Sequence, residues 1–288
     1  MISWKMLVVL MLVVGSYHRS AAGAETFAII SLNLDGTDVA LLAEDPKQNY
    51  GSVDVSNDGK MIAFDAWPLP TFVNTKQWII VATVDGKNKR KVIKGGMPKW
   101  SPDDKLIAFQ DYVNGVAVAQ PDGGGRELVS PENGSPSWIQ GGNGLAVLEW
   151  GRNIQVVDLI EGGFRRLDKN GIPGILWGFA VSKDGKKVCY SQRTPKEGIY
   201  KIVVTDLDGS TIPKTLHTGE VVTGFGWHPD GKRIIFAEGE KASQVFILDI
   251  ETGKTVKVPG DKNESYVNPC FSRDGKRIFC SSTIRPGK

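Results

Sequence analysis

One short pattern recurs along this chain and limits what the chain can fold into. It sets a bulky apolar residue before a polar turn containing Asp and Lys, then an apolar run, as in "WSPDDKLIAF" (100–109). A degenerate copy, "SPSWIQGGNGLAVLEW" (135–150), makes six in all. The period of about 45 residues predicts a repeat architecture. The five clear copies align on their turn lysines, which are Lys60, Lys105, Lys186, Lys232 and Lys276.

Each copy is interpreted as a β-hairpin with one buried face. Apolar residues stand two and four positions after the turn lysine, as at Ile107 and Phe109, and residues two apart on a strand share a face. The Asp-Gly or Asp-Asp pair supplies a tight reversal, since Gly accepts a positive φ and Asp can bond its own backbone. The turn aspartates are therefore interpreted as structural, because they recur in every clear copy whereas a single active site needs one.

A second alternating hairpin follows each of the first five copies, as in "WIIVATVDGKNKRKVI" (78–93), so each unit has four strands. The sixth copy, at 268–283, has no such hairpin after it, whereas "FAIISLNLDGTDVALLAE" (27–44) has the second pattern and no first hairpin before it. We expect these N-terminal and C-terminal hairpins to join and close a ring, which removes a free sheet edge.

The expected fold class is therefore all-β, a six-bladed β-propeller of four-stranded antiparallel blades over residues 25–288. A pair of β-sandwiches and a seven-bladed ring are the alternatives, and neither explains six units of each kind.

The first residues have the layout of a secretory signal peptide. Lys5 precedes an apolar run from Met6 to Val14, and Ala22-Gly23-Ala24 matches an A-x-A cleavage site. The run is too short to span a bilayer, and no other run is long enough. We expect residues 1–24 to be removed and the product to be periplasmic or secreted, without a membrane span. An uncleaved anchor or a buried strand is the alternative.

Charge does not point to a nucleic-acid partner. The whole chain has a net charge of +3, and loss of Lys5 and Arg19 with the signal segment would leave +1. The longest basic cluster, "DGKNKRKVIK" (85–94), lies beside a predicted turn and is interpreted as a solvated outer strand.

The three cysteines, Cys189, Cys270 and Cys280, cannot form a disulfide framework, because their number is odd. Cys270 and Cys280 lie on the two arms of one hairpin. A bridge between them and free buried thiols are both consistent with the sequence.

The turn sequences resemble the WD-like propeller repeat of the TolB periplasmic proteins. The same repeat occurs in the propellers of prolyl-oligopeptidase-type enzymes and of some polysaccharide lyases, so the resemblance implies a fold more strongly than a function. It covers roughly residues 27–283. The turns that carry it are "SNDGK" (56–60), "SPDDK" (101–105), "SKDGK" (182–186), "HPDGK" (228–232) and "SRDGK" (272–276).

Two parts of those families have no counterpart in this sequence. TolB proteins carry an α/β domain before the propeller that meets inner-membrane Tol components, and only the signal segment stands there. The peptidases carry a hydrolase domain with a Ser-Asp-His triad, and no G-x-S-x-G elbow occurs. His217 and His228 are the only histidines after the signal segment, and they lack the spacing of metal ligands. We therefore expect no enzyme activity, no cofactor and no metal.

Candidate binding residues come from the positions at which the copies differ. These positions lie in the loops between the two hairpins of a blade and in one blade-to-blade segment. By the resemblance, this loop face and the mouth of the central channel form the usual binding surface. The candidates are Trp67 and Phe72 in "DAWPLPTFVNTKQ" (65–77), together with Asp111, Tyr112, Trp150, Arg152, Trp177, Arg193 and Glu238.

Tyr, Trp and Arg are enriched at the hot spots of protein interfaces. We therefore expect an exported TolB-like propeller that acts as a monomer and binds an envelope protein or peptide. The alternative is a carbohydrate-binding or polysaccharide-degrading propeller, which clustering of Asp111, Glu149 and Glu238 would favour. A protein that only scaffolds an envelope complex is a third possibility.

Overall fold

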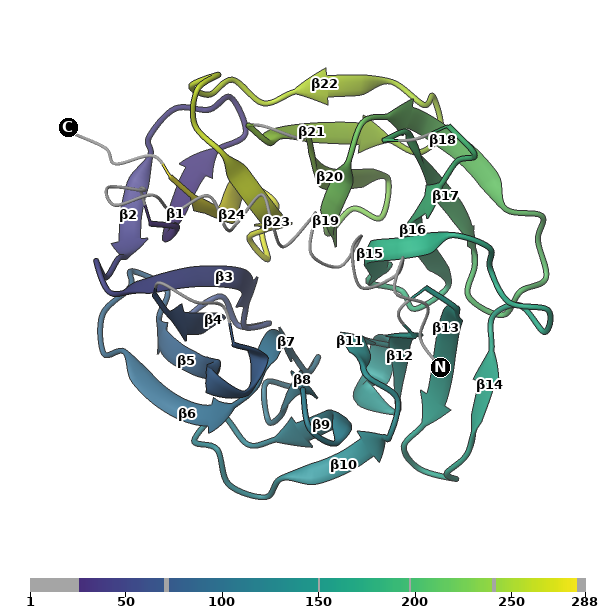
Figure 1. Cartoon of the computed structure of the whole chain (residues 1–288), viewed down its shortest axis with the longest axis horizontal. Helices are drawn as coiled ribbons and strands as arrows, with labels where there is room; N and C mark the ends of the chain where they lie inside the picture. The colour runs from purple at the N-terminus through teal and green to yellow at the C-terminus, as the bar shows by residue number, and fades with distance from the viewer. Residues whose placement is uncertain (1–25, 70–72, 150, 197, 240–241, 284–288) are drawn as a thin grey trace.

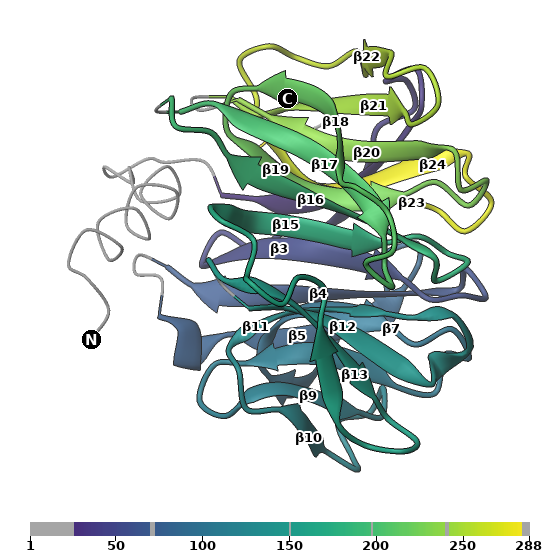
Figure 2. The same ribbon diagram turned by 90° about the vertical axis from the view of Figure 1, so that its right-hand side faces the viewer.

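The computed structural model describes residues 26–69, 73–149, 151–196, 198–239 and 242–283. These residues form six four-stranded antiparallel sheets arranged around a central axis (Figure 1). The side view shows the sheets packed face to face around that axis (Figure 2). The six-bladed propeller predicted from the repeat is confirmed, whereas the expected signal peptide, residues 1–24, lies outside the described residues.

Each blade runs from an innermost strand, here called A, through B and C to an outer strand D. The first blade contains β3 (Gln48–Val55), β4 (Met61–Pro68), β5 (Trp78–Thr83) and β6 (Arg90–Lys94). The second contains β7 (Gly96–Trp100), β8 (Ile107–Asp111), β9 (Gly115–Ala119) and β10 (Glu127–Ser130). The third contains β11 (Gly134–Trp138), β12 (Gly144–Glu149), β13 (Asn153–Asp158) and β14 (Phe164–Arg166).

The fourth blade contains β15 (Ile175–Val181), β16 (Lys187–Arg193), β17 (Tyr200–Asp206) and β18 (Lys214–Gly219). The fifth contains β19 (Val222–Trp227), β20 (Arg233–Glu238), β21 (Gln244–Asp249) and β22 (Thr255–Lys257). The sixth contains β23 (Tyr266–Phe271), β24 (Arg277–Ser282), β1 (Ala28–Asn33) and β2 (Ala40–Ala43). Two short 3₁₀ turns, η1 (Asn74–Lys76) and η2 (Gln140–Gly142), complete the described elements. Within this part of the chain, no helix has the length and apolar character needed to cross a membrane.

The sixth blade joins the two ends of the chain. Its B strand, β24, pairs with β1, so that Ala28 lies opposite Ser282 and Ile30 lies opposite Cys280. The predicted closure by N-terminal and C-terminal hairpins is confirmed. It ties the first and last parts of the chain into one sheet and completes the ring.

The turn between strands A and B is held by the residues that define the repeat. In the second blade the Ser101 hydroxyl donates to Asp103 at 2.7 Å and accepts the Leu106 N–H, while the Lys105 N–H donates to Asp103. The bond from Ser101 is the main cause that lowers the pKa of Asp103. The turn aspartates therefore serve folding, as predicted. The same set of bonds recurs at Ser56, Ser182 and Ser272.

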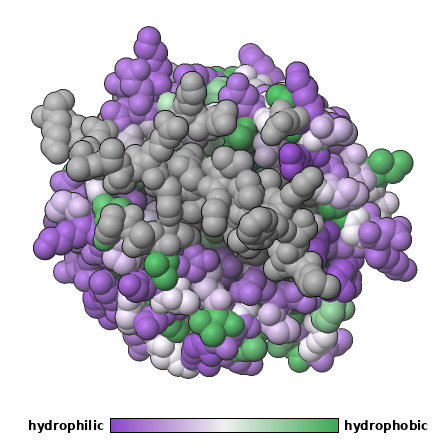
Figure 3. Space-filling view, viewed as in Figure 1, coloured by the Kyte–Doolittle hydropathy of each residue, from purple (hydrophilic) through white to green (hydrophobic). Residues whose placement is uncertain are grey.

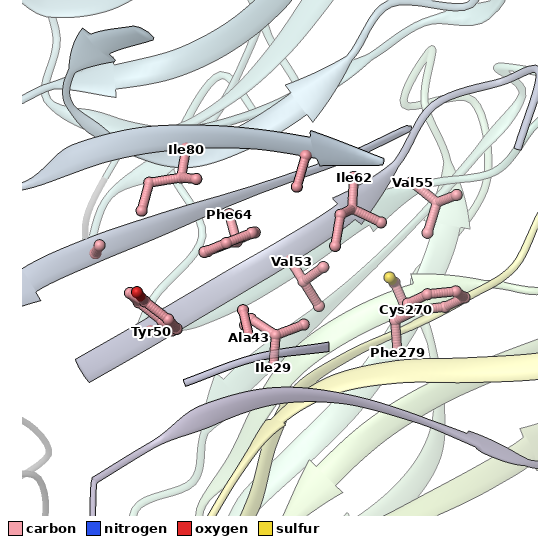
Figure 4. Close-up of a cluster of buried hydrophobic side chains, with 12 residues drawn as sticks. Ile29, Ala43, Tyr50, Val53, Val55, Ile62, Phe64, Ile80, Cys270 and Phe279 are labelled. Carbon is pink, nitrogen blue, oxygen red and sulfur yellow. The ribbon is translucent and has the colours of Figure 1, made fainter. Parts of the chain in front are cut away.

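Apolar side chains of the B strands fill the space between neighbouring blades. Phe64, Phe109 and Phe236 occupy the same repeat position, four residues after the turn lysine, and all are fully buried. Figure 4 shows one such cluster, in which Phe64 and its neighbours meet Ile29 and Phe279 of the sixth blade. These layers fix the six inner strands around the axis.

All three cysteines are free and buried. Cys270 lies opposite Phe279 rather than Cys280, and the two thiols belong to different hydrophobic clusters. Of the two states consistent with the sequence, the structure therefore shows free thiols. Burial raises the pKa of Cys270 to about 12, so this thiol is protonated at neutral pH.

Candidate functional site

The first predicted anchor, Trp67, does not stand on a loop. β4 continues through Pro68 because residues 65–68 keep pairing with β3, where Trp67 lies opposite Asn49. The side chain of Trp67 is 7% exposed, and its ring lies over Gly51, where an added Cβ would come 2.9 Å from the ring. The predicted loop therefore begins at residue 69, and Trp67 packs on its own blade.

Three predicted carboxylates end their strands on this loop face, and each has its own basic partner. Glu149, which is almost fully buried, lies 3.1 Å from Arg166. Asp111 pairs with the Arg126 guanidinium. Glu238 lies 2.8 Å from His217. Because each charge is already engaged within the protein, these carboxylates do not form the free acid and base pair that glycoside hydrolysis uses.

The other candidates differ in exposure, and some of them lie outside the described residues. Tyr112 is half-buried, whereas the Arg152 and Arg193 side chains are exposed. Phe72 and Trp150 lie outside the described residues, and Trp177 is placed only as part of β15. On the face seen in Figure 3, the residues around the grey atoms are mainly hydrophilic, with hydrophobic ones scattered among them. The loop face thus offers exposed arginines, and one of them, Arg193, lines a second cavity of about 370 Å³ that the fourth blade forms by itself, with Pro173, Gln192 and Lys201.

A cavity of about 330 Å³ lies instead on the axis, at the end where the A–B turns gather. All six blades contribute to its wall. Two repeat positions account for most of the polar lining. We call these sets the inner ring, six residues before the turn lysine, and the rim ring, three residues before it; in the third blade Asn143 aligns with the lysine. The inner ring is Asp54, Lys99, Ser137, Ala180, Gly226 and Cys270, and the rim ring is Asn57, Pro102, Gln140, Lys183, Pro229 and Arg273.

One side of the cavity is charged. Asp54 accepts the Trp100 N–H at 2.8 Å, and its carboxylate lies 3.7 Å from Lys99 and 3.8 Å from Arg273. Lys183 is a third cation at the rim, on the fourth blade across the axis from Asp54, and is exposed. Within the described wall of the cavity there are therefore three cations and one carboxylate, so the cavity as a whole carries an excess of positive charge.

At the level of the inner ring, the opposite side of the cavity is apolar and has small residues. Ala180 and Gly226, of the fourth and fifth blades, stand beside Phe225 and Trp227. The Trp227 indole N–H donates to the Ala180 carbonyl at 2.9 Å, which fixes the ring against the neighbouring blade. The cavity therefore combines a cationic wall with a rigid aromatic wall.

The sequence analysis missed these rings because it treated repeated positions as structural. The signal was present in the copies themselves. The inner-ring position reads Asp, Lys, Ser, Ala, Gly and Cys from blade to blade, whereas the neighbouring apolar positions change far less. Such variation at a fixed repeat position fits a position that borders the axis.

A buried carboxylate, Asp65, lies toward the loop end of the first blade. Asp65 is 3% exposed and accepts the Met97 N–H of the second blade at 2.8 Å. Met97 has a φ of 55°, in the left-handed region, at a β-bulge of its inner strand. Burial raises the pKa of Asp65 to about 6, although the Met97 N–H opposes that shift. The Asp65 carboxylate of the first blade thus holds the left-handed backbone at Met97 of the second blade.

No group of three His, Cys, Asp or Glu side chains that could hold a metal occurs in the described part of the chain. The arrangement of side chains that converges most clearly is therefore the channel cavity. Its chemistry is that of a binding site with cationic and aromatic walls.

Comparison with known proteins identifies the fold. No protein-family model matches the chain. The structure of putative TolB from Agrobacterium tumefaciens superposes with a TM-score of 0.72 at 17% identity, covering 90% of this chain and 98% of that one. TolB from Acinetobacter baumannii superposes with a TM-score of 0.69 at 17% identity, covering 86% of this chain and 66% of that one. The predicted resemblance to TolB propellers is thus confirmed as a likeness of fold.

A distant sequence relative also exists among curated proteins. Dipeptidyl-peptidase 5 of Porphyromonas endodontalis is 26% identical to this chain, over 58% of this chain and 32% of the peptidase. The chain therefore spans about a third of the length of this relative.

Proposed function

We propose that this protein is an exported, non-enzymatic TolB-like propeller that binds a segment of a polypeptide partner in the channel cavity. The observation that carries the proposal is the pair of rings, where twelve residues from six blades converge on one axis. Those loop-face candidates that the structure describes lack such convergence. The proposal therefore moves the binding site from the loop face, where the sequence places it, to the turn end of the channel.

The dimensions of the cavity favour a short segment of chain. A volume of about 330 Å³ lies at the small end of the ~300–1,000 Å³ range of ligand pockets. A whole domain cannot enter it, whereas one or two residues of an extended or turning segment can.

The charges favour an acidic residue in that segment. Asp54 is within 4 Å of two cations, so it can offset only one of them, and Lys183 has no ion pair among the described residues. An incoming carboxylate would find excess positive charge in a partly dehydrated site, where ion pairs are stronger than at a flat surface. Phe225 and Trp227 would take an apolar neighbour of that acid.

Two observations favour a peptide over a sugar. The 26% identical relative is named a dipeptidyl-peptidase. Hydrolysis of a glycosidic bond would need a pair of free carboxylates, whereas Glu149 pairs with Arg166 and Glu238 lies 2.8 Å from the His217 ring nitrogen. We therefore place the polysaccharide alternative second.

The test uses the chain without residues 1–24 and an array of short synthetic peptides that combine acidic, basic, apolar and polar residues. We expect acidic peptides with an adjacent apolar residue to bind and to quench the tryptophan fluorescence of the cavity wall. The double variant Lys99→Gln/Lys183→Gln should bind at least tenfold more weakly. The matched variant Lys232→Gln/Lys254→Gln removes the same charge from exposed positions of the fifth blade and should bind as the wild type does.

Two results would contradict this function. One is equal binding of basic and acidic peptides. The other is unchanged binding by the Lys99→Gln/Lys183→Gln variant. Export has a separate test, which is N-terminal sequencing of the protein recovered from the periplasm or medium, where a new terminus at Glu25 is expected.

A further inference from the structure

The outer strand of the first blade carries an unusual concentration of positive charge. Residues 74–94 contain six basic residues and one acid, a net charge of +5, whereas the whole chain has +3. The rest of the protein is therefore slightly acidic. The charge is confined to η1, to the turn after β5 and to β6. Strand β6 lies at the outer edge of the propeller, away from the axis (Figure 1). The basic residues are Lys76, Lys87, Lys89, Arg90, Lys91 and Lys94.

The equivalent strands of the other blades differ from β6. Three of its five residues are basic, and all three are exposed. The nearest counterpart is β14, whose two arginines are used within the protein: Arg165 donates to the Leu207 carbonyl at 2.8 Å, and Arg166 pairs with Glu149. A repeat position that becomes strongly basic in only one blade is not required by the fold.

The charges of this strand are only partly neutralised by their neighbours. Lys87 pairs with Asp85 at 2.9 Å, and the Lys94 ammonium lies 5.9 Å from the centre of the Trp78 ring. Among the described residues, no ion pair engages Lys89, which leaves its ammonium group facing solvent. Outside the segment, the pKa of Asp45 is lowered mainly by the Lys47 N–H and to a smaller extent by the charges of Lys47 and Lys89.

The spacing of the side chains gives the patch its shape. Residues of a strand rise about 3.3 Å each, so 89–94 form a row roughly 17 Å long with basic groups on both sides of the strand. Because this strand is the outer edge of its blade, a flat surface that meets the blade edge-on lies near the cations of both sides. The partly buried Trp78 beside Lys94 adds an aromatic group of the kind that favours the boundary between lipid headgroups and water.

We propose that the basic strand of the first blade, 87–94 with Trp78, docks the propeller edge-on to an anionic phospholipid surface. Charge complementarity carries this inference: a row of cations, of which only Lys87 has an ion pair among the described residues, fits a plane of negative headgroups, and each basic residue near such a surface strengthens binding about fivefold. The channel cavity, on the axis, stays open in this orientation. The proposal does not depend on the proposed function, and either can fail alone.

The test is sedimentation of the chain without residues 1–24 with vesicles of phosphatidylcholine, with and without phosphatidylglycerol. The wild type should bind the anionic vesicles at low salt and should be released as salt rises, because exposed charges are screened. The variant Lys89→Gln/Arg90→Gln/Lys91→Gln should bind on the order of 100-fold more weakly. The matched variant Lys232→Gln/Lys254→Gln/Lys257→Gln, with the same net charge, should bind within about threefold of the wild type.

Three outcomes would overturn the proposal. One is equal binding to vesicles without phosphatidylglycerol. Another is an equal loss in the two triple variants, which would indicate a general charge effect. The third is binding of heparin, a soluble polyanion, without binding of vesicles. Thermal unfolding confirms that each variant is folded, and the single charge reversal Lys89→Glu gives a second test that should weaken vesicle binding more than Lys89→Gln does.

Discussion

The two ends of the propeller axis differ in how their varied residues are arranged. At the loop end, Asp111, Glu149 and Glu238 vary between blades, but each is tied to a separate partner. At the turn end, the inner and rim rings vary just as much, yet they face one shared cavity. Variation between copies therefore does not by itself reveal a site. The symmetry of the fold must also bring the varied positions together.

The difference has a geometric cause. A propeller places the same repeat position of every blade at the same height around the axis, so an inward-facing position of strand A becomes a ring. The B–C loops differ in length and direction from blade to blade, so their residues do not superpose in this way. A position between blades and a position that faces the axis should therefore respond differently to substitution.

The largest effect is expected from Phe236→Ala. Phe236 is fully buried, and its ring lies 5.6 Å from that of Phe246 and 6.3 Å from that of Phe225, measured between centroids. Removing it leaves a cavity between two blades, and the free energy of unfolding should fall by about 3–5 kcal/mol in urea denaturation. Lys183→Gln, at the exposed rim, should change it by less than about 0.5 kcal/mol. Equal losses would show that the rim ring also supports the fold.

The second effect concerns Asp65, whose pKa of about 6 in the folded protein lies above its value of about 4 in an unfolded chain. Between these two pH values the folded state binds more protons. The stabilisation from this group is therefore complete below pH 4 and is lost as pH rises toward 6. Two pKa units correspond to about 3 kcal/mol.

Asp65→Asn removes this pH dependence, because the amide does not titrate. Relative to the wild type, the variant should gain about 3 kcal/mol in free energy of unfolding between pH 4 and pH 7.5. Urea denaturation of the two proteins side by side measures it, since the turn aspartates with lowered pKa contribute equally to both. Parallel pH profiles would mean that Asp65 titrates normally and does not strain the blade boundary.

The fold could be predicted almost completely from the sequence, whereas the site could not. The turns, the B-strand core and the closure of the sixth blade all depend on local chemistry that repeats, so one copy explains the others. The prediction that Trp67 lies on a loop was wrong, because the pairing of β3 with β4 extends past the repeat, through Pro68. The raised pKa of Asp65 depends on its burial against the next blade, which the sequence of one copy of the repeat does not reveal.

A smaller effect is expected from Asp104, which occupies the glycine position of the repeat turn with a φ of 61°. Its carboxylate accepts the backbone N–H groups of Asn57 and Asp58, at 2.8 Å for the latter, and so clamps the second blade to the first. Asp104→Ala loses both bonds and keeps the left-handed backbone, which should cost about 1–2 kcal/mol. Asp104→Gly relieves the backbone and should cost less, as comparison of melting temperatures will show.

The smallest effect, and the sharpest test of the comparison, is expected from Arg152→Ala and Arg193→Ala on the loop face. Both side chains are exposed, so each change should alter the free energy of unfolding by less than about 0.5 kcal/mol. Peptide binding should also stay at the wild-type level, because neither arginine lines the channel cavity. A loss of binding in these variants, with Lys99→Gln/Lys183→Gln unaffected, would return the site to the loop face. In that case the rings would be varied only because the fold leaves axial positions unconstrained.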